Sequence, residues 1–129
     1  MNKEMIICLL VIIFVIVGNI ITQKNTSKVV EEINSGLTEV KEQISNQYVN
    51  QEKAKLKMNE IEEMWRQEHD KMAFYIEHDE LEKVETELTR LKADIETKEY
   101  TMGVENLDNC IFMLEHIKDK SALKIVNIF

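Results

Sequence analysis

The sequence has no proline, only three glycines and only two cysteines among its 129 residues. Scarce glycine and the lack of strand alternation argue against a β-sandwich and against the glycine-rich loops that hold nucleotide phosphates. Basic residues are also fewer than acidic ones: the sequence has 16 Lys and Arg against 24 Asp and Glu, which gives a net charge of −8. A nucleic-acid binder needs a basic face, so we expect no nucleic-acid partner. The Glu-, Lys-, Leu- and Ile-rich remainder predicts an all-α protein.

The two cysteines predict neither a disulfide scaffold nor a reactive thiol. Cys8 lies in an apolar run near the N-terminus and Cys110 in a distal helical region, so pairing is not expected. Cys110 falls on the edge of an apolar stripe, and the nearby charges, Asp108 and Glu115, are acidic. Because thiolates are favoured by positive neighbours, we predict a buried thiol that packs as a small apolar group.

One uncharged run, Met5–Ile21, has Asn19 as its only polar side chain. As a helix it spans about 25 Å, slightly less than the ~30 Å hydrocarbon core of a bilayer. We therefore predict an uncleaved transmembrane signal-anchor over residues 1–22, bound to membrane lipid. The alternative is a signal peptide cut between Gly18 and Asn19, but Ile16 is bulky where the cleavage site prefers a small residue.

The orientation of this segment is weakly determined. Lys3 precedes it and Lys24 and Lys28 follow it, so the distribution of positive charge favours neither topology. A very short N-terminus before a single anchor most often stays in the cytoplasm of bacteria. We therefore expect a single-pass protein of the cell membrane with residues 23–129 outside it.

Beyond the anchor, the spacing of apolar residues predicts helices. We expect a polar link at Lys24–Lys28, a membrane-proximal helix or linker over residues 23–50, and a helical bundle over residues 51–129. A break is predicted at Ser45–Asn50, and one unbroken helix over residues 27–77 is the alternative. The apolar positions recur every three or four residues, at Val30, Ile33, Leu37, Val40, Ile44, Ala54, Met58, Ile61, Trp65 and Met72.

Two further helices follow the same spacing. The boundary at His78-Asp79, with Asp79 as the cap, and a turn near Thr97–Thr101 separate them. Gly103 lies where a missing side chain permits close helix approach. Three antiparallel helices result, and the segment 27–45 can add a fourth. The apolar positions are Leu81, Val84, Leu88, Leu91 and Ile95, then Tyr100, Val104, Leu107, Ile111, Leu114 and Ile117.

The histidines give no sign of a metal site. None of His69, His78 and His116 follows a glutamate by three residues, the spacing that bundle di-iron sites use. His78 lies between Glu77 and Asp79, a cluster that suits a weak divalent site, but a simple helix–turn junction is the favoured interpretation. We predict no catalytic residue, no cofactor and no enzyme.

Trp65 is the only tryptophan, and Met58 and Met72 lie two helical turns either side of it. This arrangement suits either an adaptable Met-rich binding face or the bundle core, and we predict the core.

Acidic residues concentrate in one segment. Residues 77–99 hold nine Asp and Glu against four Lys and Arg. Glu80, Glu87 and Asp94 recur every seven residues, and we predict a solvated stripe away from the apolar seam. The alternative is a docking surface for a basic partner.

The last residues of the sequence are too apolar for a free tail. Asp119-Lys120-Ser121 can end the last helix, and we expect the following residues to fold back over an open end of the bundle. Docking into a partner is the alternative. The apolar residues are Leu123, Ile125, Val126, Ile128 and Phe129.

A set of residues in the distal half carries a resemblance to a known family: Trp65, the run Tyr75-Ile76-Glu77-His78-Asp79-Glu80-Leu81, Leu88, Arg90-Leu91, Glu115-His116-Ile117 and Asn127-Ile128-Phe129. With these residues the distal half resembles a bacterial family of small membrane-anchored helical proteins, domain-of-unknown-function family 4363. The likeness covers about residues 60–129 and the general layout of the anchor. It implies this architecture, and the family has no assigned activity, so no catalytic residue carries over.

Two functions are compatible with this sequence. The first is a non-enzymatic, membrane-anchored module that binds another membrane or surface protein, with self-association possible. The second is an extracytoplasmic sensor that binds a small ligand or divalent ion between helices near His78 or Trp65.

Overall fold

A computed structural model describes the backbone of residues 2–128 and the side chains of residues 2–123. The described chain is all-helical, as the sequence predicts. It forms α1 (Lys3–Ser45), α2 (Gln51–Met72), α3 (His78–Glu96) and α4 (Tyr100–Ile128).

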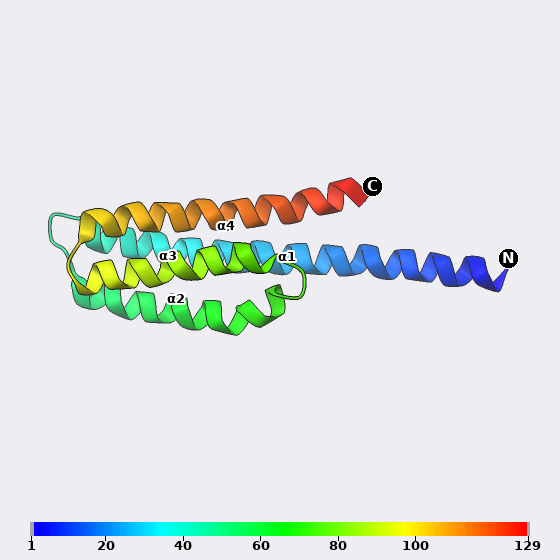
Figure 1. Ribbon diagram of the computed structural model, residues 1–129, viewed down its shortest axis with the longest axis horizontal. Helices are drawn as coiled ribbons and strands as arrows, with labels where there is room; N and C mark the ends of the chain where they lie inside the picture. The colour runs from blue at the N-terminus through cyan, green and yellow to red at the C-terminus, as the bar shows by residue number, and fades with distance from the viewer. Residues whose placement is uncertain (1, 129) are drawn as a thin grey trace.

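The four helices run antiparallel to their neighbours in sequence and form one bundle, with α1 also beside α4 (Figure 1). The α2–α3 pair packs less closely than the other three pairs. The segment 27–45 therefore does add a fourth helix, and the expected break after Ser45 is present. The first half of α1 continues beyond the bundle as a single projecting arm (Figure 1).

The core of the bundle is made by the seams that the sequence predicts. All of the expected apolar positions of α1, α2 and α3 are buried, from Val30 to Ile95. In α4, Leu107, Leu114 and Ile117 are buried as predicted, but Gly103 and Cys110 also lie on the buried stripe, and Tyr100, Val104 and Ile111 flank it. The buried side chains of α4 are Leu107, Cys110, Leu114 and Ile117.

The expected polar link at Lys24–Lys28 is wrong, because α1 passes through it without interruption. Thr26 is fully buried, and its hydroxyl donates to the backbone carbonyl of Thr22 at 2.7 Å. A hydroxyl satisfied four residues back in this way does not need to cap a new helix. The polar residues of this segment are therefore accommodated inside one helix of 43 residues.

The connections are short and locally satisfied. Asn50 caps α2 by accepting a hydrogen bond from the Lys53 backbone N–H at 3.1 Å. At the end of α3, Lys98 adopts φ 61°, and the Glu99 N–H donates to the Asp94 carbonyl at 2.8 Å, which is the pattern of a Schellman turn. The cap predicted at Asp79 is wrong by two residues, because α3 begins at His78 and Glu77 takes the capping position without a side-chain bond.

The last helix differs from the prediction. No turn forms at Asp119-Lys120-Ser121, and α4 continues to Ile128. Leu123 is exposed. The side chains of residues 124–129, and hence most of the expected cover over the end of the bundle, lie outside the described residues.

Two helical glycines differ in how closely the neighbouring helix approaches. A Cβ built on Gly36 would lie 3.0 Å from Cγ1 and 3.1 Å from Cδ1 of Ile61, a buried side chain of α2. A Cβ on Gly103 would lie 3.4 Å from Cδ1 of Ile44, which is ordinary contact. The close approach that the sequence suggested for Gly103 is therefore found at Gly36.

This contrast predicts opposite effects for one substitution. Gly103→Ala should raise the free energy of unfolding by about 0.5–1 kcal/mol, because alanine has the higher helix propensity. Gly36→Ala should lower it, because the new methyl group displaces buried Ile61 and overpacking costs about 1–3 kcal/mol. Urea unfolding of both variants measures the difference, and an equal gain for both would contradict the close packing of α1 on α2.

Candidate membrane segment and docking groove

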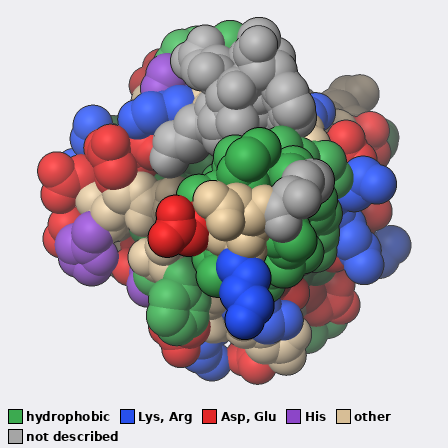
Figure 2. All heavy atoms as spheres, turned by 90° about the vertical axis from the view of Figure 1, so that its right-hand side faces the viewer, with side chains coloured by type: hydrophobic (Ala, Val, Ile, Leu, Met, Phe, Trp, Pro, Cys, Tyr) green, Lys and Arg blue, Asp and Glu red, His purple; other side chains and the backbone are tan. Residues whose placement is uncertain are grey.

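The projecting arm of α1 is apolar and uncovered. The helix is long and apolar enough to cross a membrane, and none of its most apolar 18-residue window is buried by the rest of the chain. Its side chains stand open, with Phe14 80 % exposed. Viewed from this end, the apolar side chains gather in one projecting patch, with charged side chains around it (Figure 2).

The base of this arm is tied to the bundle by a small polar cluster. The hydroxyl groups of Thr26 and Tyr75 lie 3.0 Å apart, and Asn25 Nδ2 donates to the Tyr75 hydroxyl at 3.3 Å. Tyr75 belongs to the connection between α2 and α3, so this connection is held against α1 where the arm leaves the bundle. Polar groups buried at such a junction specify geometry because each needs a partner.

The acidic stripe of α3 is not the solvated face that the sequence predicted. The Glu87 residue is only 6 % exposed, and the side chain of Glu80 is largely covered. Asp94 accepts a hydrogen bond from Asn106 Nδ2 at 2.6 Å. Each of the three lies one residue before a seam position, so the sevenfold repeat places them at the flank of the seam, facing α4.

Two acids of this flank, Glu80 and Glu87, have basic partners. Lys120 lies 3.1 Å from Glu80 Oε1 and 3.5 Å from Glu77 Oε1, and its hydrogen bond to Glu80 raises the lysine pKa. Arg90 lies 3.0 Å from Glu87 Oε1. The contacts of Lys120 join α4 to the start of α3, whereas the Arg90–Glu87 pair lies within α3. Partly exposed ion pairs each contribute only about 0–1 kcal/mol.

A surface groove follows the contact between α3 and α4. It consists of two adjoining hollows of about 420 and 260 Å³ that share Lys83 and Met113. Phe112, 74 % exposed, stands at its edge, and Glu87 Oε2 is buried without a hydrogen-bond partner among the described residues. We call this surface the α3–α4 groove; its other lining residues include Asp79, Glu80, Glu82, Thr86, Arg90 and His116.

Sequence reasoning missed Phe112. The signal was available, because an aromatic residue directly after Ile111 cannot share the buried stripe if Cys110 and Leu114 are its centre. Large exposed aromatic side chains are enriched at protein interfaces, where burial of one ring contributes much of the binding energy.

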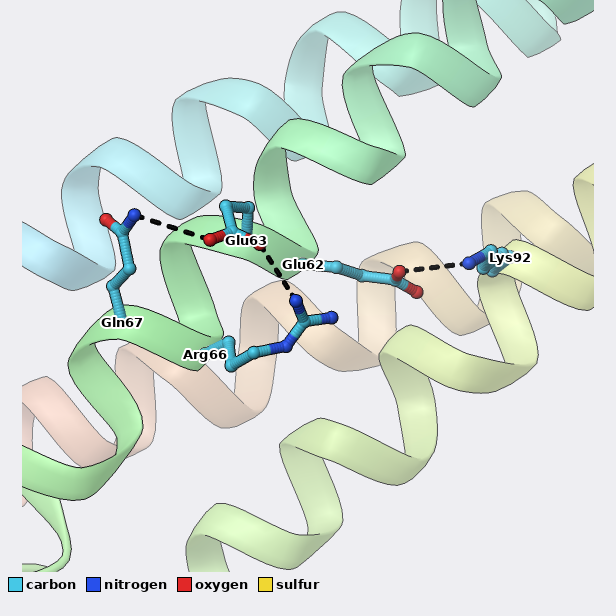
Figure 3. A network of polar contacts seen from close by, with 5 residues as sticks. All are labelled: Glu62, Glu63, Arg66, Gln67 and Lys92. Carbon is cyan, nitrogen blue, oxygen red and sulfur yellow. Dashed lines mark hydrogen bonds and ion pairs between the residues drawn. The ribbon is translucent and has the colours of Figure 1, made fainter.

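The surface between α2 and α3 is held by polar contacts. Lys92 Nζ lies 3.1 Å from Glu62 Oε2 and joins the two helices (Figure 3). Glu63 accepts from Arg66 at 2.9 Å and from Gln67 at 3.4 Å, both within α2 (Figure 3). This exposed network positions side chains more than it stabilises the fold.

The histidines lie apart from one another. His78 has a 79 % exposed side chain whose ring approaches Glu82 only at 4.0 Å, and His116 approaches Glu80 at 3.9 Å. His69 contacts Asp70, and its ring lies in an edge-type arrangement with the Trp65 ring at a centroid distance of 6.0 Å. Within the described part of the chain, no group of three or more His, Cys, Asp and Glu residues is placed to hold a metal ion.

Trp65 lies in the core, as predicted, and so do Met58 and Met72. The Met-rich binding face is therefore not present at these residues.

Cys110 is a buried thiol at the contact of α4 with α3, as predicted. Burial, with a smaller effect of the Glu87 charge, raises its pKa to about 12. Almost no thiolate is therefore present near neutral pH, and the folded protein presents an unreactive sulfur.

This burial predicts that Cys110 is protected until the protein unfolds. In a Cys8→Ser variant at pH 8, iodoacetamide should leave the native chain unmodified and should alkylate it fully in denaturant, as measured by intact mass. The same reagent on a Cys8→Ser, Tyr48→Cys variant is the control, because Tyr48 is exposed and its cysteine should react at once. Rapid native alkylation at Cys110 would contradict the packing of α4.

No curated protein and no solved structure matches this chain. The model of a family described as Domain of unknown function (DUF4363) matches residues 20–128, nearly the whole chain and more than the distal half in which the sequence resemblance was found. It includes all four helices of the bundle and the base of the apolar arm, and it assigns no activity. This chain, an all-helical bundle with an apolar N-terminal helix, belongs to the DUF4363 family.

Proposed function

We propose that the chain is a single-pass membrane protein whose bundle is a non-enzymatic module that binds another membrane or surface protein. One observation carries the proposal. The single helix α1 holds both the exposed apolar arm and the eight buried positions between Thr26 and Ile44 that help to build the bundle. An arm that is rigidly continuous with a folded domain fixes the distance and tilt of that domain at the surface in which the arm is buried.

The composition of the arm supports insertion into a bilayer. Thirteen of the 17 residues in Met5–Ile21 are Leu, Ile, Val or Phe. At about 0.3–0.6 kcal/mol each, they favour insertion by roughly 4–8 kcal/mol. The run is also longer than the ~7–15 apolar residues of a signal peptide. These values support an uncleaved anchor.

The α3–α4 groove supports protein binding. An exposed phenylalanine, Phe112, lines one of the two hollows together with Glu80, and Asp79 and Glu82 line the adjoining one. The complementary partner is a segment that offers an apolar side chain next to Lys or Arg, since opposite charge aligns the two surfaces and the ring supplies contact area. No observation favours the sensor, whose candidate residue His78 is exposed and whose other candidate, Trp65, is packed in the core.

If Met5–Ile21 is an uncleaved anchor, the mature protein should still contain the whole arm. The protein extracted from membranes should have an intact mass that includes residues 1–18. Arginine at both Ile13 and Val15 should release it into the soluble fraction, because each arginine costs about 2.5–3.5 kcal/mol within a membrane helix. Tyr48→Arg is the matched control, at an exposed site in the connection at the far end of the bundle, and should stay in the membrane. A mature chain that starts at Asn19 would refute the anchor.

If the α3–α4 groove binds a partner, substitutions in it should weaken binding without unfolding the protein. After cross-linking in membranes, Phe112→Ala and the double change Asp79→Lys, Glu82→Lys should each lower the yield of the same cross-linked partner at least tenfold. Tyr48→Ala removes an equally exposed aromatic ring elsewhere and should leave the yield unchanged. Equal yields from all variants, at equal melting temperatures, would place the partner on another surface.

A further inference from the structure

The end of α4 reaches the level of the apolar arm. Three polar pairs set the register of α4 on α1: Lys41–Asp108 at 2.9 Å, Asn34–Glu115 at 3.0 Å and Glu31–Lys118 at 3.5 Å. From one pair to the next, the position on α4 advances by the same number of residues by which the position on α1 moves back, as expected for two antiparallel helices. Continuing this register places the backbone of Ile128 at about the level of Ile21.

The other two helices end before this level. The connection between α2 and α3 is held at Asn25 and Thr26 by Tyr75. By the same register, Thr26 is level with Leu123. Past Leu123, the helical backbone of α4 therefore has only α1 beside it among the described elements, and Figure 1 shows α4 extending beyond the α2–α3 connection along α1.

The sequence of this last part of α4 suits hydrocarbon better than water. Residues 122–128 read ALKIVNI, with Lys124 as the only charge. The side chain of Leu123, the last that the structure describes, is exposed. On α1 at this level, Lys24 and Lys28 are exposed, and neither forms an ion pair within the described residues, although the chain as a whole is acidic. Lysines at the edge of an apolar segment reach towards lipid phosphates.

We infer that the end of α4, Leu123–Ile128, reaches the headgroup region of the same leaflet beside α1, with Ile128 level with the last apolar residue of the arm, so that the protein contacts the membrane with two helices. The occupant of this apolar helix end is lipid. The inference rests on the proposed anchor, because it takes the level of the membrane from the arm. Two helices at the surface would fix the rotation of the bundle about α1, which one helix leaves free, and would hold the α3–α4 groove in one direction.

The test measures the depth of single labels in the full chain. Cysteine is placed at Ile128, Ser121, Phe14 or Tyr48 in a Cys8→Ser background, labelled with an environment-sensitive fluorophore and reconstituted in vesicles of phosphatidylcholine and phosphatidylglycerol. Native Cys110 is buried and stays unlabelled. Lipids that carry a doxyl group quench labels in the bilayer, and aqueous iodide quenches labels in water. Retained helicity and melting temperature confirm that each variant is folded.

The label at Ile128 should be quenched most by lipid whose doxyl group lies near the headgroup. The label at Phe14, two turns deeper along α1 than Ile21, should be quenched most by lipid whose doxyl group lies further down the acyl chain. Iodide should reach neither label as it reaches the label at Tyr48. The label at Ser121, two turns further from the membrane, and the label at Tyr48 should be quenched by iodide. An Ile128 label that is open to iodide while Phe14 is lipid-quenched overturns this inference and leaves the anchor intact. An Ile128 label shielded from both quenchers overturns it in favour of protein cover. If Phe14 itself is open to iodide, the anchor fails first.

Discussion

The structure depends on the continuity of α1. A single helix presents every side of its first half to the surroundings and only one face of its second half, and the change takes place over about one turn near Thr26. No glycine or proline lies between Asn19 and Ser35, and α1 is helical throughout, so a tilt of this part of the helix is also a tilt of the bundle. The hydrogen bonds of Tyr75 to Asn25 and Thr26 reinforce this point, because they clamp the α2–α3 connection onto the same turn.

The helix pairs of the bundle pack in chemically different ways. The α1–α2 contact is close, since Gly36 leaves room only for the side chain of Ile61. The α3–α4 contact is partly polar, with Glu80 and Glu87 covered at its flank and Cys110 beneath them. A buried carboxylate needs a partner, so Lys120 and Arg90 are structural residues as much as surface charges. The groove above this contact is where apolar and acidic groups are exposed together.

The local sequence predicted the buried faces of the helices well and the points at which helices begin and end poorly. The spacing of Val30, Leu37 and Ile44, and of the corresponding residues in α2 and α3, defines the core because only one face of a helix can be buried in a bundle. The polar stretch at Lys24–Lys28 and the charged one at Asp119-Lys120-Ser121 were predicted as interruptions, yet both are helical. Asn, Thr and Ser end a helix when their side chains bond to the local backbone, but Thr26 is instead satisfied by Thr22 within the helix and by Tyr75 across the bundle. Tyr75 is 49 residues away in the sequence, so rules that use only neighbouring residues could not predict this contact.

The sequence by itself determined the helical class, the buried seams, the apolar arm and the core position of Trp65. These follow from periodicity and composition, which act within one helix. The tertiary structure decided that Glu87 is covered, that Phe112 is exposed and that the end of α4 lies level with the arm. Each of these depends on which helix lies alongside and in which register, and that choice is made by the sum of contacts between helices far apart in the sequence.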